Sequence, residues 1–301
     1  MIPIRPPLAM ALALFIPGAG HLYAGWPRHA LLLAVSVPSV LLMLSVATAL
    51  EMLSISLFVP LVCLIPSALQ IGAAVDAGRK ARTPILAPNR ISNRAFVVVF
   101  ALVSLAATLF TSIGIERTTL SARRMSSATM TPNLLVGDYV ILRRPWFMST
   151  PAPGDILEFR FPRDRRFTYL QRVLAVGGQT LQFDGTPPVI DDVAGAWTEE
   201  RAVDWLAADC ALQPGEQVVE RLETAAYSVL LPTEPEVGVD LSVPDSTVYV
   251  VNDNRRYRGD SRKFGPVERS EVSGQVLGIG FSWDACAGSV RLDRVGALAN
   301  P

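Results

Sequence analysis

The sequence predicts a membrane-anchored α-helical segment followed by a mainly β domain with antiparallel strands and an inserted cap. Half of the 301 residues are hydrophobic, which is high for a water-soluble protein. The long uncharged stretches all lie before about residue 116. The rest of the chain is divided by Gly, Pro and Asp into short runs of β-branched and aromatic residues, a pattern typical of antiparallel strands.

Residues 1–116 are predicted to form the anchor. Three of its stretches carry no charge over the roughly 20 residues that a bilayer requires. These predicted transmembrane helices are residues 30–50, 53–75 and 95–115.

An earlier apolar segment, residues 6–27, is interrupted by Pro17, Gly18, Gly20 and Gly25. We expect it to be interfacial or re-entrant, and the sequence leaves open whether it spans the membrane.

The charges at the ends of these stretches predict the orientation of the chain. Residues 76–94 contain four Arg and one Lys, and loops rich in these residues stay in the cytoplasm. The next span then leads outward. We therefore expect a multi-pass protein of the cytoplasmic (inner) membrane whose C-terminal domain is extracytoplasmic, with the lipid bilayer as one partner.

The C-terminal half is predicted to be a β core formed by residues 117–178 and 245–287. The strands expected across the whole C-terminal half are Tyr139–Leu142, Ile156–Phe161, Tyr169–Val176, Ser228–Leu231, Thr247–Val251 and Gln275–Phe281. Residues 179–244 differ in composition and are expected to be an inserted cap, in which the run A-V-D-W-L-A-A-D could form one or two helical turns. Residues 288–301 are expected to be a C-terminal tail.

Composition excludes several classes of function. The 27 basic and 27 acidic residues balance, so nothing indicates a nucleic-acid partner. The three Cys and two His residues have no metal-ligand spacing, and we expect neither a metal nor a cofactor. Whether Cys210 and Cys286 pair stays open, although the spacing alone favours two unpaired residues.

The most informative stretch follows the last predicted span and reads M-S-S-A-T-M-T-P-N-L-L-V-G-D, from Met125 to Asp138. It resembles the nucleophile box of the type I signal peptidases, S-x-S-M-x-P-T-L-x-x-G-D. The residues in register are Ser127, Met130, Pro132, Leu134, Gly137 and Asp138.

Three further boxes of that family follow in the same order along residues 120–285. They are Gly154-Asp155-Ile156 with Phe159, then Tyr169-Leu170-Gln171-Arg172, then Asn252-Asp253-Asn254-Arg255 with Gly259-Asp260-Ser261-Arg262. The resemblance implies a signal-peptidase type of β domain. It also implies a Ser–Lys dyad that cleaves the signal peptides of exported precursor proteins.

This sequence departs from the dyad at three linked positions. The nucleophile position holds Thr129, whose β-methyl group restricts its rotamer. The base position holds Gln171, a carboxamide that cannot take a proton at neutral pH. Arg258 replaces the serine that helps to orient the lysine. These changes favour a site that is silent or slow.

The resemblance assigns other residues to the cleft and its support. Ser127 matches the oxyanion hydroxyl, although a turn-capping serine explains it equally well. Met130 and Pro132 are expected to shape the substrate-facing loop, with core packing as the alternative for Met130. The expected structural and orienting residues are Tyr169, Arg172, Asp253, Asn254, Arg255, Arg258, Asp260, Ser261 and Arg262. Within this set, the resemblance implies an ion cluster of Arg172, Asp260 and Arg262.

Three functions remain open. The favoured one is a signal peptidase relative that binds signal peptides or exported precursors without efficient hydrolysis, or that partners an active signal peptidase or the secretion machinery. The second is an active peptidase that uses Thr129 with an unrecognised base. The third is a structural membrane protein that uses its β domain for assembly.

Overall fold

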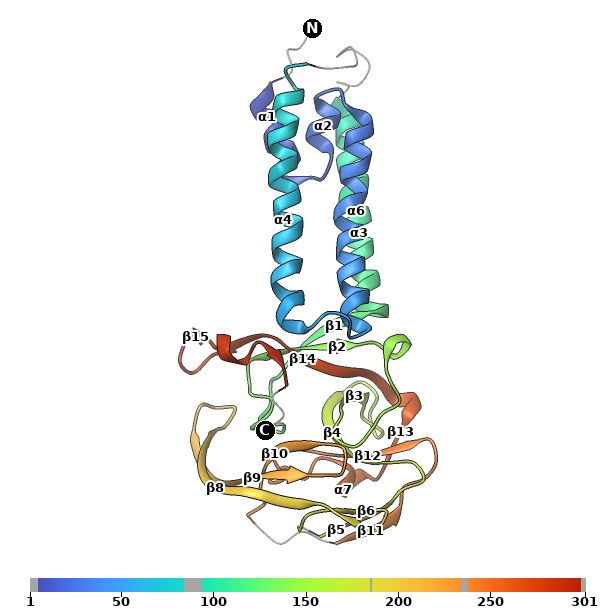
Figure 1. Cartoon of the computed structure of the whole chain (residues 1–301), viewed down its shortest axis with the longest axis vertical. Coiled ribbons are helices and arrows are strands. Elements are labelled where there is room, and N and C mark those ends of the chain that lie inside the picture. The colour runs from blue at the N-terminus through green and yellow to red at the C-terminus, as the bar shows by residue number, and fades with distance from the viewer. Residues whose placement is uncertain (1–4, 84–93, 185, 234–237, 299–301) are drawn as a thin grey trace. The chain divides into compact units, whose positions relative to one another are not determined.

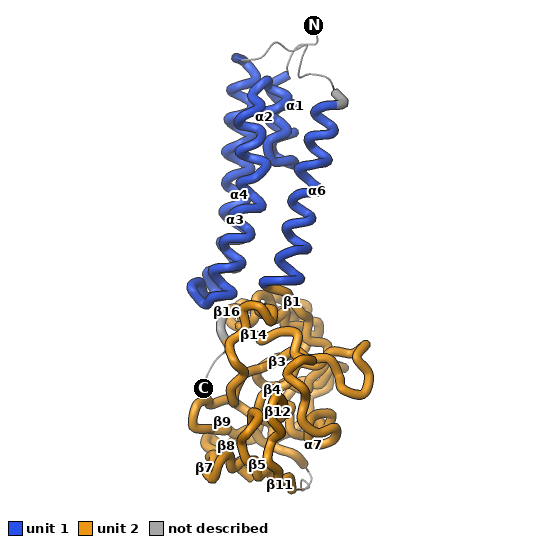
Figure 2. The backbone as a smooth tube through the Cα atoms, turned by 90° about the vertical axis from the view of Figure 1, so that its right-hand side faces the viewer, with its two compact units in different colours: residues 1–119 blue, residues 120–301 orange. Residues whose placement is uncertain are grey.

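The computed structural model describes residues 5–83, 94–184, 186–233 and 238–298, and the chain divides into two compact units, residues 1–119 and 120–301 (Figure 2). The boundary between the units, after Thr119, lies close to the change from apolar stretches to short β-branched runs in the sequence. The basic residue Arg90, used above to predict orientation, lies outside the described residues.

The first unit is helical. Its helices are α1 (Pro6–Phe15), α2 (Ala19–Tyr23), α3 (Pro27–Ala49), α4 (Ile55–Lys80) and α6 (Arg94–Thr118). Among the described residues, three helices are long and apolar enough to cross a membrane, namely α3, α4 and α6. They cover the three predicted spans, with ends that differ by a few residues.

Residues 6–27 form the two short helices α1 and α2, with a break at Gly18 where φ is 83°. Helix α1 is 10 residues long, about half of what a bilayer requires. It packs against α4 (Figure 1). Glycine is needed at position 20, because a Cβ atom there would lie 2.1 Å from the carbonyl oxygen of Ala9. The interruptions in the sequence therefore mark a tightly packed turn between two helices.

The second unit is built on an antiparallel sheet in the spatial order β1-β2-β14-β3-β4-β12-β13. The bounds are β1 (Leu120–Arg124), β2 (Asp138–Arg143), β14 (Val272–Asp284), β3 (Ile156–Arg160), β4 (Thr168–Val176), β12 (Thr247–Val251) and β13 (Val267–Glu268). Five of the six expected strands lie in this sheet, whereas Ser228–Leu231 overlaps a strand of a smaller sheet. Short helical turns occur at η1 (Pro145–Phe147), α7 (Ser261–Phe264), η2 (Arg269–Glu271) and η3 (Leu292–Arg294).

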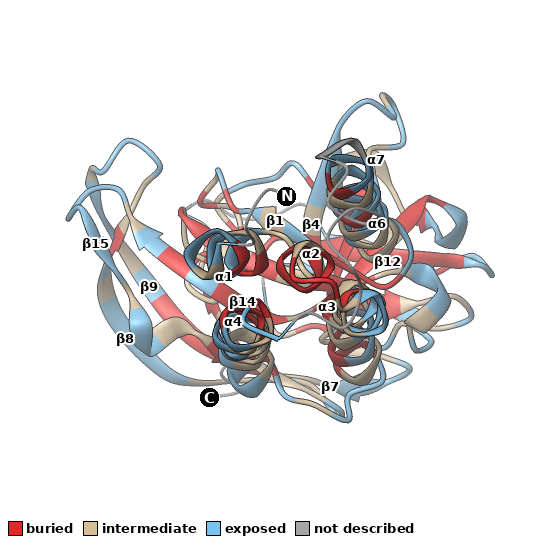
Figure 3. Cartoon of the chain, turned by 90° about the horizontal axis from the view of Figure 1, so that it is seen from above, coloured by how far each residue is buried: buried red, intermediate tan, exposed pale blue. Residues whose placement is uncertain are grey.

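Most of the residues predicted as a cap form two small sheets. One has the order β10 (Ala226–Leu230), β9 (Leu212–Arg221), β8 (Ala196–Leu206), and the other β11 (Val239–Ser242), β5 (Thr180–Phe183), β6 (Val189–Ile190), β7 (Val193–Ala194). The run A-V-D-W-L-A-A-D enters strand β8, so the helical turns expected there are not formed. Pairing with β9 along the hairpin outweighs the weak local helix preference, and β8 is largely exposed (Figure 3).

The end of the chain is also more ordered than a tail. Strands β15 (Ser289–Val290) and β16 (Gly296–Ala297) both pair with β14. Leu298 packs against the hydrophobic cluster that includes Val140, Leu142 and Ile279. Because these pairings are short, the sequence carries little strand signal for them.

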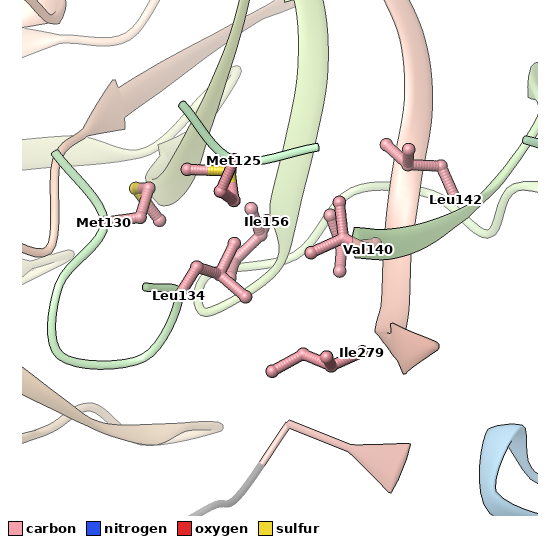
Figure 4. Packing of buried hydrophobic residues seen from close by; sticks show 8 residues of the cluster. Met125, Met130, Leu134, Val140, Leu142, Ile156 and Ile279 are labelled. Carbon is pink, nitrogen blue, oxygen red and sulfur yellow. The ribbon is translucent and has the colours of Figure 1, made fainter. Parts of the chain in front are cut away.

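One hydrophobic core lies beside the nucleophile box (Figure 4). Met125, Met130 and Leu134 of this loop point toward Ile156 and Val140 of the sheet. All five side chains are buried. The loop is thus fixed to the sheet by its apolar residues.

Cys210 and Cys286 form a disulfide, with their Cα atoms 5.7 Å apart. This corrects the expectation that both residues are unpaired. Cys210 lies in the turn between β8 and β9, and Cys286 lies in the turn between β14 and β15. Their sequence separation is 76, so no local pattern in the sequence indicates this proximity.

Candidate active-site cleft

The loop from Met125 to Asp138 is closed at its base by backbone hydrogen bonds. The Met125 N–H donates to the Asp138 carbonyl at 2.7 Å, and the Gly137 N–H donates to the Met125 carbonyl at 2.9 Å. Gly137 has φ of 93°, and a Cβ atom there would lie 1.9 Å from the Trp283 carbonyl oxygen. Glycine is therefore required for this turn.

The same base is held by the Asp138 carboxylate. Its oxygens accept hydrogen bonds from the Leu135 N–H at 2.8 Å and the Ser282 hydroxyl at 2.6 Å. Arg294 forms an ion pair with it at 2.6 Å. The Gly-Asp pair that closes the sequence box thus closes the loop in space.

The tip of the loop is held from a second direction by Asn254. The Asn254 backbone N–H donates to the Thr129 carbonyl at 3.0 Å, and its side-chain amide donates to the Ala128 carbonyl at 3.3 Å. Asn254 is fully buried. The last box of the sequence therefore positions the residue at the nucleophile position of the first.

The Thr129 hydroxyl hydrogen-bonds the Ser127 hydroxyl, with an O–O distance of 2.8 Å. Ser127 Oγ also lies 3.3 Å from the Thr129 backbone N–H, which donates to it. Ser127 therefore caps the turn around Thr129 and contacts its hydroxyl. The two roles weighed for Ser127 are compatible in this geometry.

Gln171 lies on β4 and is 2% exposed. Its side-chain Nε2 donates to Asn252 Oδ1 at 3.0 Å and to the Gly259 carbonyl at 2.8 Å. Within the described part of the chain, its carbonyl oxygen Oε1 is buried without a hydrogen-bond donor. No hydrogen bond therefore joins Gln171 to the hydroxyl of Thr129.

Thr129 and Gln171 nevertheless line one cleft of about 480 Å³. Ser127, Tyr169 and Arg258 line it as well. The remaining wall residues are Arg123, Arg124, Met125, Ser126, Glu158, Thr168, Leu170, Asn252, Tyr257 and Gly259. The structure thus brings together both dyad positions and three of the other predicted site residues.

The cleft offers one carboxylate, Glu158, which is 2% exposed. It is held by Arg123 at 2.6 Å and Arg144 at 3.2 Å, and its Oε2 accepts from the Ser273 hydroxyl at 2.7 Å. Arginine stays protonated in proteins and cannot act as a base. The described residues that line the cleft include neither lysine nor histidine.

Other predicted site residues lie outside the lining of the cleft. Met130 is fully buried in the core, which agrees with the packing alternative, and Pro132 follows a cis peptide bond. The Ser261 hydroxyl accepts from the Val250 N–H at 3.0 Å. Arg255 pairs with Glu220 at 2.6 Å.

The ion cluster expected from the resemblance forms two separate pairs. Arg172 binds Asp253 with two hydrogen bonds of 2.6 and 2.7 Å, and Asp260 pairs with Arg262 at 2.7 Å. Burial by itself would lower the pKa of Arg172, but the charge and hydrogen bonds of Asp253 outweigh it and raise this pKa. Asp253 is the partner that the resemblance did not assign to Arg172.

Sequence reasoning missed Glu158 and Asn252 as residues of the site. Glu158 is a carboxylate inside a strand that is otherwise buried, which is a signal that reading the strand alternation could have found. Asn252 stands where the signal peptidases have glycine, and its side chain holds Gln171. Both residues could have been noticed in the sequence, but their contacts could not have been predicted from it.

Comparison with known proteins gives a matching family model, a similar curated protein and a similar solved structure. A family model described as signal peptidase, peptidase S26 matches residues 94–281. Signal peptidase I of Aquifex aeolicus (strain VF5) is 26% identical over 196 residues, covering 54% of this chain and 75% of the relative. A crystal structure of a signal peptidase I from Enterococcus faecalis V583 covers 42% of this chain and 97% of its own, at 23% identity and a TM-score of 0.26.

The family match includes more than half of the chain and all four boxes described above. It begins at α6 and ends within β14. This chain therefore belongs to the signal peptidase, peptidase S26 family.

Proposed function

We propose that this protein binds the signal peptides of exported precursor proteins at the outer face of the cytoplasmic membrane and hydrolyses them slowly or not at all. The observation that carries the proposal is the chemistry around Gln171. Its amide nitrogen is committed to two acceptors, and a carboxamide cannot remove a proton from Thr129. The position where the family needs a base holds a hydrogen-bonding group.

The surroundings of Thr129 support the same conclusion. Its hydroxyl is paired with Ser127, which is a weak acid and a weak base. Glu158 shares the cleft, but its oxygens already accept from two arginines and Ser273. The described hydrogen bonds and ion pairs of this carboxylate lead to Arg123, Arg144 and Ser273, and none of them leads to Thr129.

Binding is supported by strand edges at the cleft. β1 is an edge strand that pairs with β2, and β12 pairs with β4 from Arg172 onward. Residues 168–171 of β4 therefore have one edge without a partner strand in the described structure, and they line the cleft together with the end of β1. An extended peptide can add as a strand to edges of this kind.

The membrane location rests on the three apolar helices and on charge. Arg79 and Lys80 end helix α4 and Arg82 follows it, which supports a cytoplasmic position for this end by the positive-inside rule. Helix α6 then leads outward, and the second unit is extracytoplasmic. Trp146, which is 87% exposed, suits contact with lipid headgroups, whereas the neighbouring Arg143 is buried and Arg144 pairs with Glu158.

If this protein binds signal peptides without hydrolysing them, another protein must process or receive the bound precursor. We therefore include an active signal peptidase, or the secretion machinery, as the proposed protein partner. Pull-down of the full-length protein from crosslinked membranes, with and without a secreted precursor, would identify it.

The test uses purified full-length protein in nanodiscs with a fluorescent precursor that carries a signal peptide. We expect saturable binding by fluorescence anisotropy and no product on gels above the level of Thr129→Ala. Cleavage that disappears in Thr129→Ala would instead establish an active peptidase with Thr129 as nucleophile. Absence of both binding and cleavage would favour an assembly role for the β domain.

A further inference from the structure

The amide of Gln171 has a fixed orientation. Its Nε2 faces the Gly259 carbonyl, which can only accept a hydrogen bond. It also faces Asn252 Oδ1, whose own amide nitrogen is used on the Tyr257 carbonyl at 2.8 Å. Rotating the Gln171 amide by 180° would place its oxygen against two acceptors. The hydrogen-bond network therefore assigns Oε1 to the remaining direction.

That oxygen is a buried acceptor without a donor in the described structure. Leaving a buried polar atom unpaired is unfavourable, and folded proteins keep few such atoms. The nearby hydroxyl of Thr129 does not supply the donor, because its hydrogen-bonding partner is Ser127. Gln171 also lines the cleft, so a molecule bound there would contact its side chain.

The position of Gln171 on β4 indicates the class of donor. It is the last of the four residues, 168–171, that lack a partner strand on one edge. A peptide added along this edge presents backbone N–H groups at regular intervals. We propose that Gln171 Oε1 accepts a hydrogen bond from one backbone N–H of the bound peptide.

This inference rests on the proposed function and deepens it. Gln171, at the base position of the family, would then bind the peptide, and its hydrogen bonds to Asn252 and Gly259 fix its orientation. The ligand class is a peptide with an unsubstituted secondary amide at one defined position.

The experiment measures binding of labelled signal peptides to the full-length protein in nanodiscs. In each peptide, one backbone amide is replaced by an ester, which removes a single N–H. Esters at positions whose N–H pairs with the β4 backbone should weaken binding in every variant. One further position should lose about 2–10-fold in affinity, the net value of one hydrogen bond, only where Gln171 is present. In Gln171→Met, which is unbranched like glutamine but lacks the carbonyl, the ester and amide peptides at that position should bind equally.

Gln182→Leu is the matched control, because Gln182 is exposed on β5 outside the cleft. It should keep the penalty at the same ester position. If Gln171→Met does not fold by thermal unfolding, Gln171→Leu replaces it in the same comparison.

Each outcome separates this inference from the proposed function. A flat ester scan with tight amide binding would overturn the role of Gln171 while leaving peptide binding intact. Ester penalties of the same size at every position in Gln171→Met would also overturn it, because other acceptors would then be responsible. Failure of the all-amide peptide to bind would instead refute the proposed function.

Discussion

The chemical difference between lysine and glutamine at position 171 lies in the side-chain nitrogen. A neutral amine has a lone pair that takes a proton, whereas an amide nitrogen has donated its lone pair to the carbonyl. In this protein the nitrogen of Gln171 donates two hydrogen bonds, to Asn252 and Gly259. Gln171 therefore has a structural role here, because its side chain joins β4 to Asn252 and Gly259.

Restoring the dyad should restore hydrolysis. We expect Thr129→Ser with Gln171→Lys to cleave a signal-peptide precursor on the order of 10²-fold faster than Thr129→Ser alone, the usual size of general-base catalysis. Burial of position 171 favours a neutral lysine, although the acceptors of Asn252 and Gly259 limit the gain. Single-turnover cleavage on gels measures the rates. An inert double variant that still binds peptide would refute this reasoning.

The pair formed by Arg172 and Asp253 should be essential for stability. Both side chains are buried, so Asp253→Asn leaves a charged guanidinium without its counter-ion. We expect a loss of about 3–5 kcal/mol in the free energy of unfolding, measured by urea titration. Asp164→Asn breaks the exposed pair with Arg166 and should leave the urea midpoint unchanged. Equal effects of the two changes would contradict this expectation.

Tyr227 should make the protein sensitive to alkali. Burial and the neighbouring Glu220 raise the pKa of Tyr227 well above its usual value. Below pH 10 both the folded and the unfolded states hold the proton, so this contribution to stability is complete. As the pH rises above about 10 the unfolded state loses the proton first, and stability falls by up to about 1.4 kcal/mol per pH unit.

The test compares unfolding free energies between pH 9 and 11.5. Tyr227→Phe should be less stable at pH 9, because it removes the hydrogen bond to Glu220, but its slope above pH 10 should be smaller. Tyr257→Phe, at a more exposed tyrosine, should keep the original slope. Identical slopes in Tyr227→Phe and the unmodified protein would refute the assignment.

The hairpin of β8 and β9 is linked to the nucleophile loop by packing and by the disulfide. Trp205 of β8 forms a buried cluster with Ala128, which directly precedes Thr129. Trp205 also meets the ring of Tyr257 edge-on, with centroids 6.4 Å apart. The disulfide fixes the turn of this hairpin to the turn after β14. The inserted segment therefore helps to hold the loop that carries Thr129.

Removing the disulfide should loosen this arrangement. We expect the double change Cys210→Ser with Cys286→Ser to lower the free energy of unfolding by about 2–4 kcal/mol. Hydrogen exchange of residues 126–134 should become faster, because the Trp205 cluster is less constrained. Cys63→Ser, which leaves the disulfide intact, is the control. Unchanged exchange in the loop would show that the hairpin does not support it.

The elements that could be predicted from the sequence are those with strong local patterns. The uncharged stretches predicted α3, α4 and α6, and the strands of the β core followed from β-branched runs. Strand β8 was not predicted, because Glu, Arg, Asp and Ala interrupt its strand-favouring Trp, Thr and Val residues and its pairing with β9 decides the outcome. The disulfide was missed for a similar reason, since two distant turns meet in three dimensions.

The site could be predicted to the level of residue positions but not of contacts. Motif register alone placed Thr129, Ser127 and Gln171, and all three line one cleft. Motif register does not say that Asn254 holds the Thr129 carbonyl or that Asp253 pairs with Arg172. These contacts cross between boxes far apart in the chain, where local patterns carry no information.

The division into two units suggests that the second one can fold alone. It contains its own hydrophobic clusters, the cleft and the disulfide within residues 120–301. We expect this fragment to be soluble, to unfold cooperatively and to bind the same peptide, with affinity within about threefold of the full-length protein if the cleft supplies most of the binding energy. Circular dichroism and anisotropy would measure this. A loss of more than tenfold would assign part of the ligand contact to the first unit.

The bond between Cys210 and Cys286 has a consequence for where the protein can mature. Glutathione and thioredoxin keep cytosolic thiols reduced, whereas the periplasm and the exterior of cells are oxidising. A copy of the protein whose second unit remained in the reducing cytosol would lack the disulfide that joins the β8–β9 turn to the turn after β14. Completion of the native state would then depend on translocation, so that this relative of leader-processing enzymes would itself have to be exported before its cleft is fully assembled.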